Sequence, residues 1–173
     1  LQGLLPLIRR ADYSIVNLET PVTELKAEWA QSKAYVHWSH LRSLTALAAA
    51  GIDAAGLANN HTLDYGRPGL AQTIDALRAS RISLFGAGKD RAGASAPLML
   101  RSTRPSGVVN AAVFGMFEYD KMYDEKQDFY AGPGKAGANA LSVKRFADQV
   151  KKLRAKTPNV FIVAYPHWGV NYR

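Results

Sequence analysis

The sequence predicts an α/β domain, in which short strands and helices alternate along the chain. The main observation is that β-favouring apolar runs such as "SIVNLE" and "NVFIVAYPHWG" are separated by segments with apolar residues at helical spacing. The composition agrees, because the 173 residues are 47% hydrophobic and 21% charged, as in folded domains with a sizeable core. We therefore expect one domain over residues 1–173, without an internal repeat or a linker.

Each expected element follows from a local pattern. Helical spacing of apolar residues predicts helices at residues 41–51, 67–80 and 142–156. Gly51 is a suitable C-terminal stop for the first helix, and Pro68 fits the first position of the second. Apolar runs predict strands at residues 14–19, 53–58, 82–88, 96–100, 107–117 and 159–169. Residues 118–140 are polar, aromatic and glycine-bearing, so we expect a long loop there.

Composition and charge exclude several classes of protein. Cysteine is absent, which excludes disulfides and thiolate metal sites, so a metal would need His, Asp, Glu or Asn ligands. The net charge of +8 favours anionic partners. Nucleic acid is not the expected partner, because the sequence has no recognised binding module and no interleaving of aromatic and basic residues.

No apolar stretch is long enough for a membrane helix. Because residue 1 is Leu, we expect a piece of a longer chain whose signal or anchor segment lies elsewhere.

Polar side chains follow three of the predicted strands, at the point where each strand ends. They are Asn17 and Glu19, then Asn59, Asn60 and His61, and finally His167. In open α/β sheets, ligand-binding and catalytic groups gather beyond the C-terminal ends of the strands. If these strands are neighbours, a carboxylate, an amide oxygen and an imidazole converge as ligands for a divalent cation. A second imidazole there would serve as a general acid or base.

Each of these residues also has an ordinary structural role open to it. Asn59 and Asn60 could form a turn and cap the next helix. Glu19 could be an exposed loop acid before Pro21, and His167 a packed residue. His37 and His40, in "HWSH", have the spacing of a metal pair, but packing at a helix start explains them better.

His61 and Asp64 are three residues apart, so their side chains meet if the turn after the strand is helical. A carboxylate bound to one imidazole nitrogen fixes the tautomer and stabilises the protonated ring. The alternative is that Asp64 caps the helix that begins near Pro68, and the spacing alone does not choose between the two roles.

The motifs "NLETP", "ANNHTLDYG" and "HWG" occur in an order that resembles the capsule synthesis protein CapA family, over nearly the whole chain. That family is associated with poly-γ-glutamate capsule production and belongs to the calcineurin-like metallophosphoesterase superfamily. The resemblance implies a metallophosphoesterase-like sandwich of two sheets flanked by helices. It also implies a centre of two divalent metal ions, Mn, Fe or Zn, at the strand ends.

The resemblance assigns a role to each strand-end residue. By matching motifs, Glu19 is the metal-bridging acid, Asn60 and His167 are metal ligands, His61 is the proton donor to a leaving group, and Asp64 orients His61. Asn59 is implied to be structural and to hold the turn.

Departures from the family pattern weaken the implied metal centre. A "GD" motif that usually precedes "NLE" and a later histidine-rich motif do not occur in this sequence, and Asn171 stands where an acid is common. Glu19, Asn60 and His167 supply one formal negative charge, whereas two cations ~3.5–4 Å apart need several anionic ligands. We therefore expect this segment alone to bind metal weakly or not at all.

The resemblance implies a bacterial cell-envelope protein of capsule or poly-γ-glutamate biosynthesis, membrane-associated through an anchor outside this segment. One expected function is metal-dependent hydrolysis, in which the substrate is a phosphoester or an anionic polymer with γ-glutamyl linkages. The alternative is a non-catalytic, polyanion-binding component of a membrane-associated capsule synthesis or export machine, with membrane-bound capsule synthesis proteins as partners. The residues alone do not choose between these functions.

Overall fold

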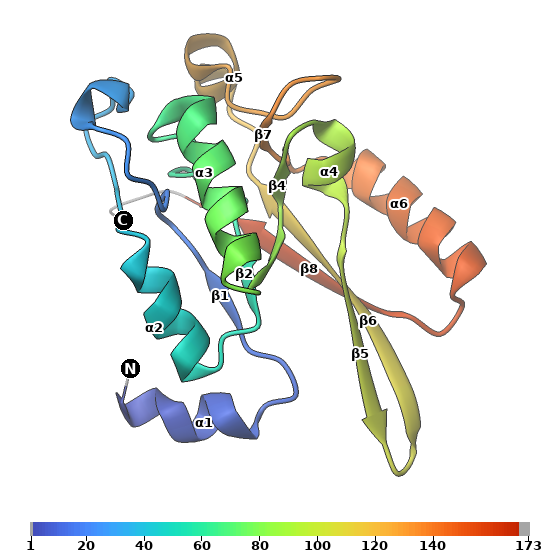
Figure 1. Ribbon diagram of the computed structural model, residues 1–173. Coiled ribbons are helices and arrows are strands. Elements are labelled where there is room, and N and C mark those ends of the chain that lie inside the picture. Colours follow the sequence, from blue (N-terminus) through green and yellow to red (C-terminus); the bar gives the residue numbers. More distant parts are fainter. Residues whose placement is uncertain (1, 170–173) are drawn as a thin grey trace.

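The computed structural model describes residues 2–169 and contains two three-stranded sheets that pack face to face between helices (Figure 1). The first sheet is parallel and has the order β1 (Ile15–Asn17), β2 (Ala54–Gly56), β3 (Ser83–Phe85). The second has the order β5 (Leu98–Arg104), β6 (Gly107–Phe117), β8 (Phe161–His167), with β5 antiparallel and β8 parallel to β6. A short antiparallel pair joins β4 (Ala87–Gly88) to β7 (Gly137–Ala138).

Six α-helices lie in the described part of the chain: α1 (Leu5–Arg10), α2 (Arg42–Ala50), α3 (Gly66–Ala79), α4 (Arg91–Ser95), α5 (Lys121–Gln127) and α6 (Val143–Lys156). Two 3₁₀ turns, η1 (Gln2–Leu4) and η2 (Ala27–Trp29), complete the regular structure. Helices α2 and α3 lie beside the first sheet, and α6 lies beside the second (Figure 1). The result is the α/β sandwich that the sequence predicts.

The first sheet buries one face against α2 and α3. Ala55 of β2 lies in one core with Leu44 of α2 and with Leu70 and Ile74 of α3. Its neighbour Ala54 points to the opposite face, as the two-residue period of a strand requires. The strand is therefore buried on both sides, which is why it consists of small residues without polar alternation.

The two sheets meet around Phe85, which packs with Ala54 and Val113. Gly115 of β6 allows this approach, because a Cβ at that position would lie 2.8 Å from Phe85 Cδ2. The other face of β6 carries Phe114, whose ring meets Phe146 of α6 edge-on with centroids 5.3 Å apart.

The structure differs from the sequence prediction in residues 118–140 and at the start of α3. Residues 118–140 are not one long loop, because they contain α5 and β7. Asp120 caps α5 by accepting a hydrogen bond from the Met122 N–H at 2.7 Å, and a seven-residue helix is too short to show a clear hydrophobic period. Helix α3 begins at Gly66, so Pro68 is its third residue rather than its first. The predicted stop of α2 is confirmed, since Gly51 has a left-handed φ of 92°.

Candidate functional site

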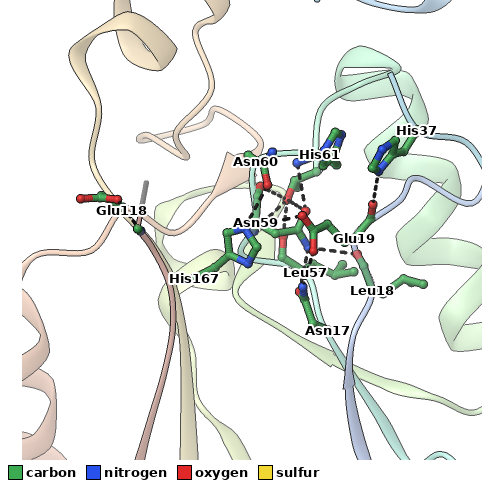
Figure 2. Close-up of polar contacts among 12 residues, drawn as sticks. Asn17, Leu18, Glu19, His37, Leu57, Asn59, Asn60, His61, Glu118 and His167 are labelled. Atoms are coloured by element: carbon green, nitrogen blue, oxygen red, sulfur yellow. Dashed lines mark hydrogen bonds and ion pairs between the residues drawn. The ribbon is translucent and has the colours of Figure 1, made fainter. Parts of the chain in front are cut away.

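The C-terminal ends of β1, β2 and β8 lie at the same edge of the sandwich, and three of the predicted site residues meet there (Figure 2). His167 Nε2 lies 2.9 Å from Asn60 Oδ1 and 3.7 Å from Glu19 Oε1. The Asn17 amide donates to Glu19 Oε2 at 2.9 Å and steadies the carboxylate. We call Glu19, Asn60 and His167 the strand-end cluster.

Asn59 connects the ends of β1 and β2. Its side chain is completely buried, and its Nδ2 donates to Asn17 Oδ1 at 3.1 Å and to the Leu18 carbonyl at 3.0 Å. Its Oδ1 accepts from the His61 backbone N–H at 3.1 Å. A buried amide with partners on both strands fixes the turn that presents Asn60 and His61.

His61 and Asp64 form a hydrogen-bonded pair, with His61 Nδ1 2.6 Å from Asp64 Oδ2. Asp64 does not cap α3, because the N-cap residue of that helix is Tyr65 and no side chain forms a capping hydrogen bond there. Because a carboxylate can only accept, His61 Nδ1 donates, which leaves its Nε2 to exchange a proton. The side chains are 7% and 0% exposed respectively, so water competes little with this contact.

Asp64 also accepts hydrogen bonds from two residues that the sequence analysis did not assign to this site. Lys33 Nζ donates to Asp64 Oδ1 at 2.5 Å and to the Asn60 carbonyl at 2.7 Å, and the His37 N–H donates to Asp64 Oδ2 at 2.6 Å. Burial opposes ionisation of Asp64, but the hydrogen bonds from His61, His37 and Lys33 outweigh it and lower the pKa of the carboxyl. Asp64 is therefore a carboxylate at neutral pH.

The His37 ring lies parallel to the His61 ring, with centroids 3.6 Å apart and an angle of 9° between the planes. His37 Nδ1 lies 3.1 Å from the Glu19 carbonyl oxygen, so it donates there. His40 lies apart from this contact and accepts from the Arg42 N–H at 3.1 Å, at the start of α2. The two histidines of "HWSH" thus make separate contacts, His37 with His61 and Glu19 and His40 with the start of α2.

Two adjoining pockets open at this edge, and α5 forms a wall of both. The larger, of about 670 Å³, is lined by His61, Glu19, Asn60 and Lys33, and by residues of α5. The smaller, of about 260 Å³, is lined by His167 and Asn60. We call them the His61 pocket and the His167 pocket, and Asn60 lines both.

The donor atoms of the strand-end cluster suit a divalent cation in kind but not in number. Carboxylate oxygen, amide oxygen and imidazole nitrogen are all metal ligands. Residues 2–169, however, contain no group of three or more His, Cys, Asp or Glu side chains arranged to hold a metal ion. Glu118, at the end of β6, does not complete the set, since its Oε2 accepts from the Gly169 N–H at 3.0 Å and it points away from the cluster (Figure 2). The cluster fits part of one coordination shell rather than a complete two-metal centre.

Comparison with known proteins agrees with the strand-end motifs. The model of the family described as "Bacterial capsule synthesis protein PGA_cap" matches residues 1–173. The chain belongs to this PGA_cap family. The assignment covers every strand and helix described above, including the ends of β1, β2 and β8.

Several curated PGA_cap-like relatives carry names from polymer and capsule synthesis. A "Probable polyglutamine synthesis accessory protein" of Mycobacterium tuberculosis is 29% identical over 93% of this chain and 42% of its own length. The "PGA biosynthesis protein CapA" of Bacillus subtilis is 24% identical over 96% of this chain and 41% of its own. The "Capsule biosynthesis protein CapA" of Bacillus anthracis is 33% identical over 49% of this chain and 21% of its own. The chain thus spans about two fifths of the length of the first two relatives.

Two further observations concern the expectations drawn from the sequence. Asn171, the departure from the family pattern named above, lies outside the described residues. None of the helices described within residues 2–169 is both long and apolar enough to cross a membrane.

Proposed function

We propose that this chain carries a metal-dependent, hydrolase-like site of capsule or poly-γ-glutamate biosynthesis. The observation that supports the proposal is the meeting of a three-donor cluster, Glu19, Asn60 and His167, with the hydrogen-bonded pair His61–Asp64 at one edge of the sheets. Ligand residues and an acid–base pair around adjoining pockets are the parts that metal-assisted hydrolysis requires.

Glu19, Asn60 and His167 would hold a divalent cation, with further ligands from the longer protein. The cation would supply Lewis-acid polarisation of a phosphoryl or carbonyl oxygen of the substrate. The neutral Asn60 amide and the partly exposed Glu19 carboxylate keep the local charge low. We therefore expect the cluster on its own to hold a cation weakly, because it supplies one formal negative charge.

His61 would give a proton to the leaving group through Nε2. Asp64 holds the opposite ring nitrogen at 2.6 Å, which leaves Nε2 as the nitrogen for proton transfer, and His61 lines the His61 pocket. Lys33 and the His37 N–H fix the carboxylate and thereby the orientation of the imidazole. The substrate is a phosphoester or a γ-glutamyl linkage of an anionic polymer.

The test is turnover by the full-length protein with manganese, on phosphodiester and γ-glutamyl substrates. His61→Asn should lower kcat by at least ~100-fold, the usual contribution of a general acid. Glu19→Gln should raise the manganese concentration needed for activity. His40→Asn is the matched control, because His40 lies outside both pockets and should leave turnover unchanged.

A second candidate, a non-catalytic role in polyanion binding within a capsule synthesis or export machine, is supported by the net charge of +8. Its partners would be membrane-bound capsule synthesis proteins. Normal capsule output in cells that carry both His61→Asn and Glu19→Gln would contradict the hydrolase and support this role.

A further inference from the structure

A third pocket, of about 390 Å³, lies beyond α5 from the His61 pocket. It is bounded by the start of α4, by α5, by the segment around β7 and by the start of α6. Its lining includes three basic side chains, Arg91, Lys135 and Arg145. We call it the arginine pocket.

Two of these basic groups have no acidic partner. Among the described residues, the guanidinium groups of Arg91 and Arg145 form no ion pair, and Arg145 Nη2 donates only to the Ala140 carbonyl, at 3.3 Å. Lys135 is bound to Asp128. The one acidic residue in the lining, Asp124, accepts the Tyr119 hydroxyl at 3.0 Å. The pocket therefore has a net positive charge and two guanidinium groups free to donate.

The first turn of α6 adds to the positive charge at this pocket. It contains Lys144 and Arg145 and no acidic residue, although the N-terminus of a helix carries the positive end of the macrodipole. Basic residues at that end destabilise a helix, whereas an anion there stabilises it. Ser142 caps the helix by accepting from the Arg145 N–H at 3.4 Å, so the start of α6 is well defined and faces the pocket.

We propose that the arginine pocket binds a carboxylate or phosphate group of an anionic ligand. Guanidinium groups bind both in bidentate geometry, and the repulsion between like charges at the start of α6 is relieved when an anion is bound. The site is separate from the strand-end cluster, because none of Glu19, Asn60 and His167 lines it. Helix α5 is the common wall, since its Asp124 borders this pocket and its Met122 and Tyr123 border the other two.

The test is titration calorimetry on the full-length protein in EDTA, which removes cation chemistry at the strand ends. The probes are inorganic phosphate and a short γ-linked glutamate oligomer. Arg91→Gln/Arg145→Gln should weaken binding at least tenfold and reduce its salt dependence. Arg10→Gln/Arg154→Gln is the matched control, because it removes the same charge from exposed residues in the last turns of α1 and α6.

The outcomes separate the two sources of the anion. Binding of the oligomer alone identifies a carboxylate polymer, and binding of phosphate alone identifies a phosphate-bearing ligand. Either result supports the proposal if the control variant binds within twofold of wild type. Equal losses in both double variants would mean a diffuse charge effect, and no saturable binding of either probe would mean no site. Both results overturn the proposal without bearing on the hydrolase, whose test uses turnover.

Discussion

Lys33→Met removes the ammonium group that faces the buried carboxylate of Asp64. Lys33 is 10% exposed and Asp64 is 0% exposed, so the pair is shielded from water. The substitution keeps most of the side-chain volume but leaves the carboxylate with only His61 and the His37 N–H as partners. Asp64 then retains a buried negative charge without its compensating cation.

The free energy of unfolding should fall by about 3 kcal/mol, because removing one partner of a buried ion pair typically costs about 3–5 kcal/mol. The lower end applies since two hydrogen bonds to Asp64 remain. The loss should be smaller in acid, because a protonated Asp64 no longer needs the ammonium group.

The assay is urea unfolding of the full-length protein, followed by tryptophan fluorescence at several pH values. Lys126→Met is the matched control, since Lys126 lines the same pocket but is exposed and forms no ion pair with the described residues. Its unfolding free energy should stay within about 0.5 kcal/mol of wild type. If Lys33→Met also stays within that range at neutral pH, the reasoning about the buried pair is refuted.

Three other predictions concern the same edge of the fold. The pKa of Asp64 is lowered in the folded state, so its ionisation stabilises the fold at pH values above the ordinary carboxyl pKa. This stability is lost as the pH falls through the pKa of the folded state. Wild type should therefore lose more unfolding free energy in acid than Asp64→Asn, and equal losses would contradict this. Gly86→Ala should cost about 2 kcal/mol in urea unfolding, because φ is +86° and the new Cβ would lie 2.7 Å from Ala58 Cβ; an unchanged midpoint would contradict this. Asn59→Ala should cost about 2 kcal/mol or more, since it leaves buried partners on β1 and at His61 unsatisfied; wild-type thermal stability would contradict it.

The sequence predicted the strand-end cluster because the rule that applies to it is topological. β1 and β2 are parallel strands of one sheet, and β8 belongs to the sheet packed against it. All three end at the same edge, so residues at these strand ends meet even when they are far apart in the chain. Asn60 and His167 are 107 residues apart in the chain, yet Asn60 Oδ1 lies 2.9 Å from His167 Nε2. The His61–Asp64 contact could be predicted from local spacing, since the two residues are three positions apart.

The remainder of the site escaped prediction for physical reasons. Lys33 and His37 lie in a segment with little regular structure, so no hydrophobic period places them opposite Asp64. Helix α5 covers seven residues, less than two and a half turns, and its cap at Asp120 cannot be told from an ordinary loop acid. Those elements form pocket walls, which is why the residues at the strand ends were easier to predict than the shape of the pockets around them.

Asp64 has one more consequence, because it also holds the segment between β1 and α2. Its backbone carbonyl accepts from the Gln31 N–H at 2.8 Å, while its carboxylate holds Lys33 and the His37 N–H. Protonation of this single acid would weaken two of the three tethers at once. The charge on which the proposed proton transfer by His61 depends thus also holds the segment that contains Lys33 and His37, so its loss would weaken both sets of contacts together.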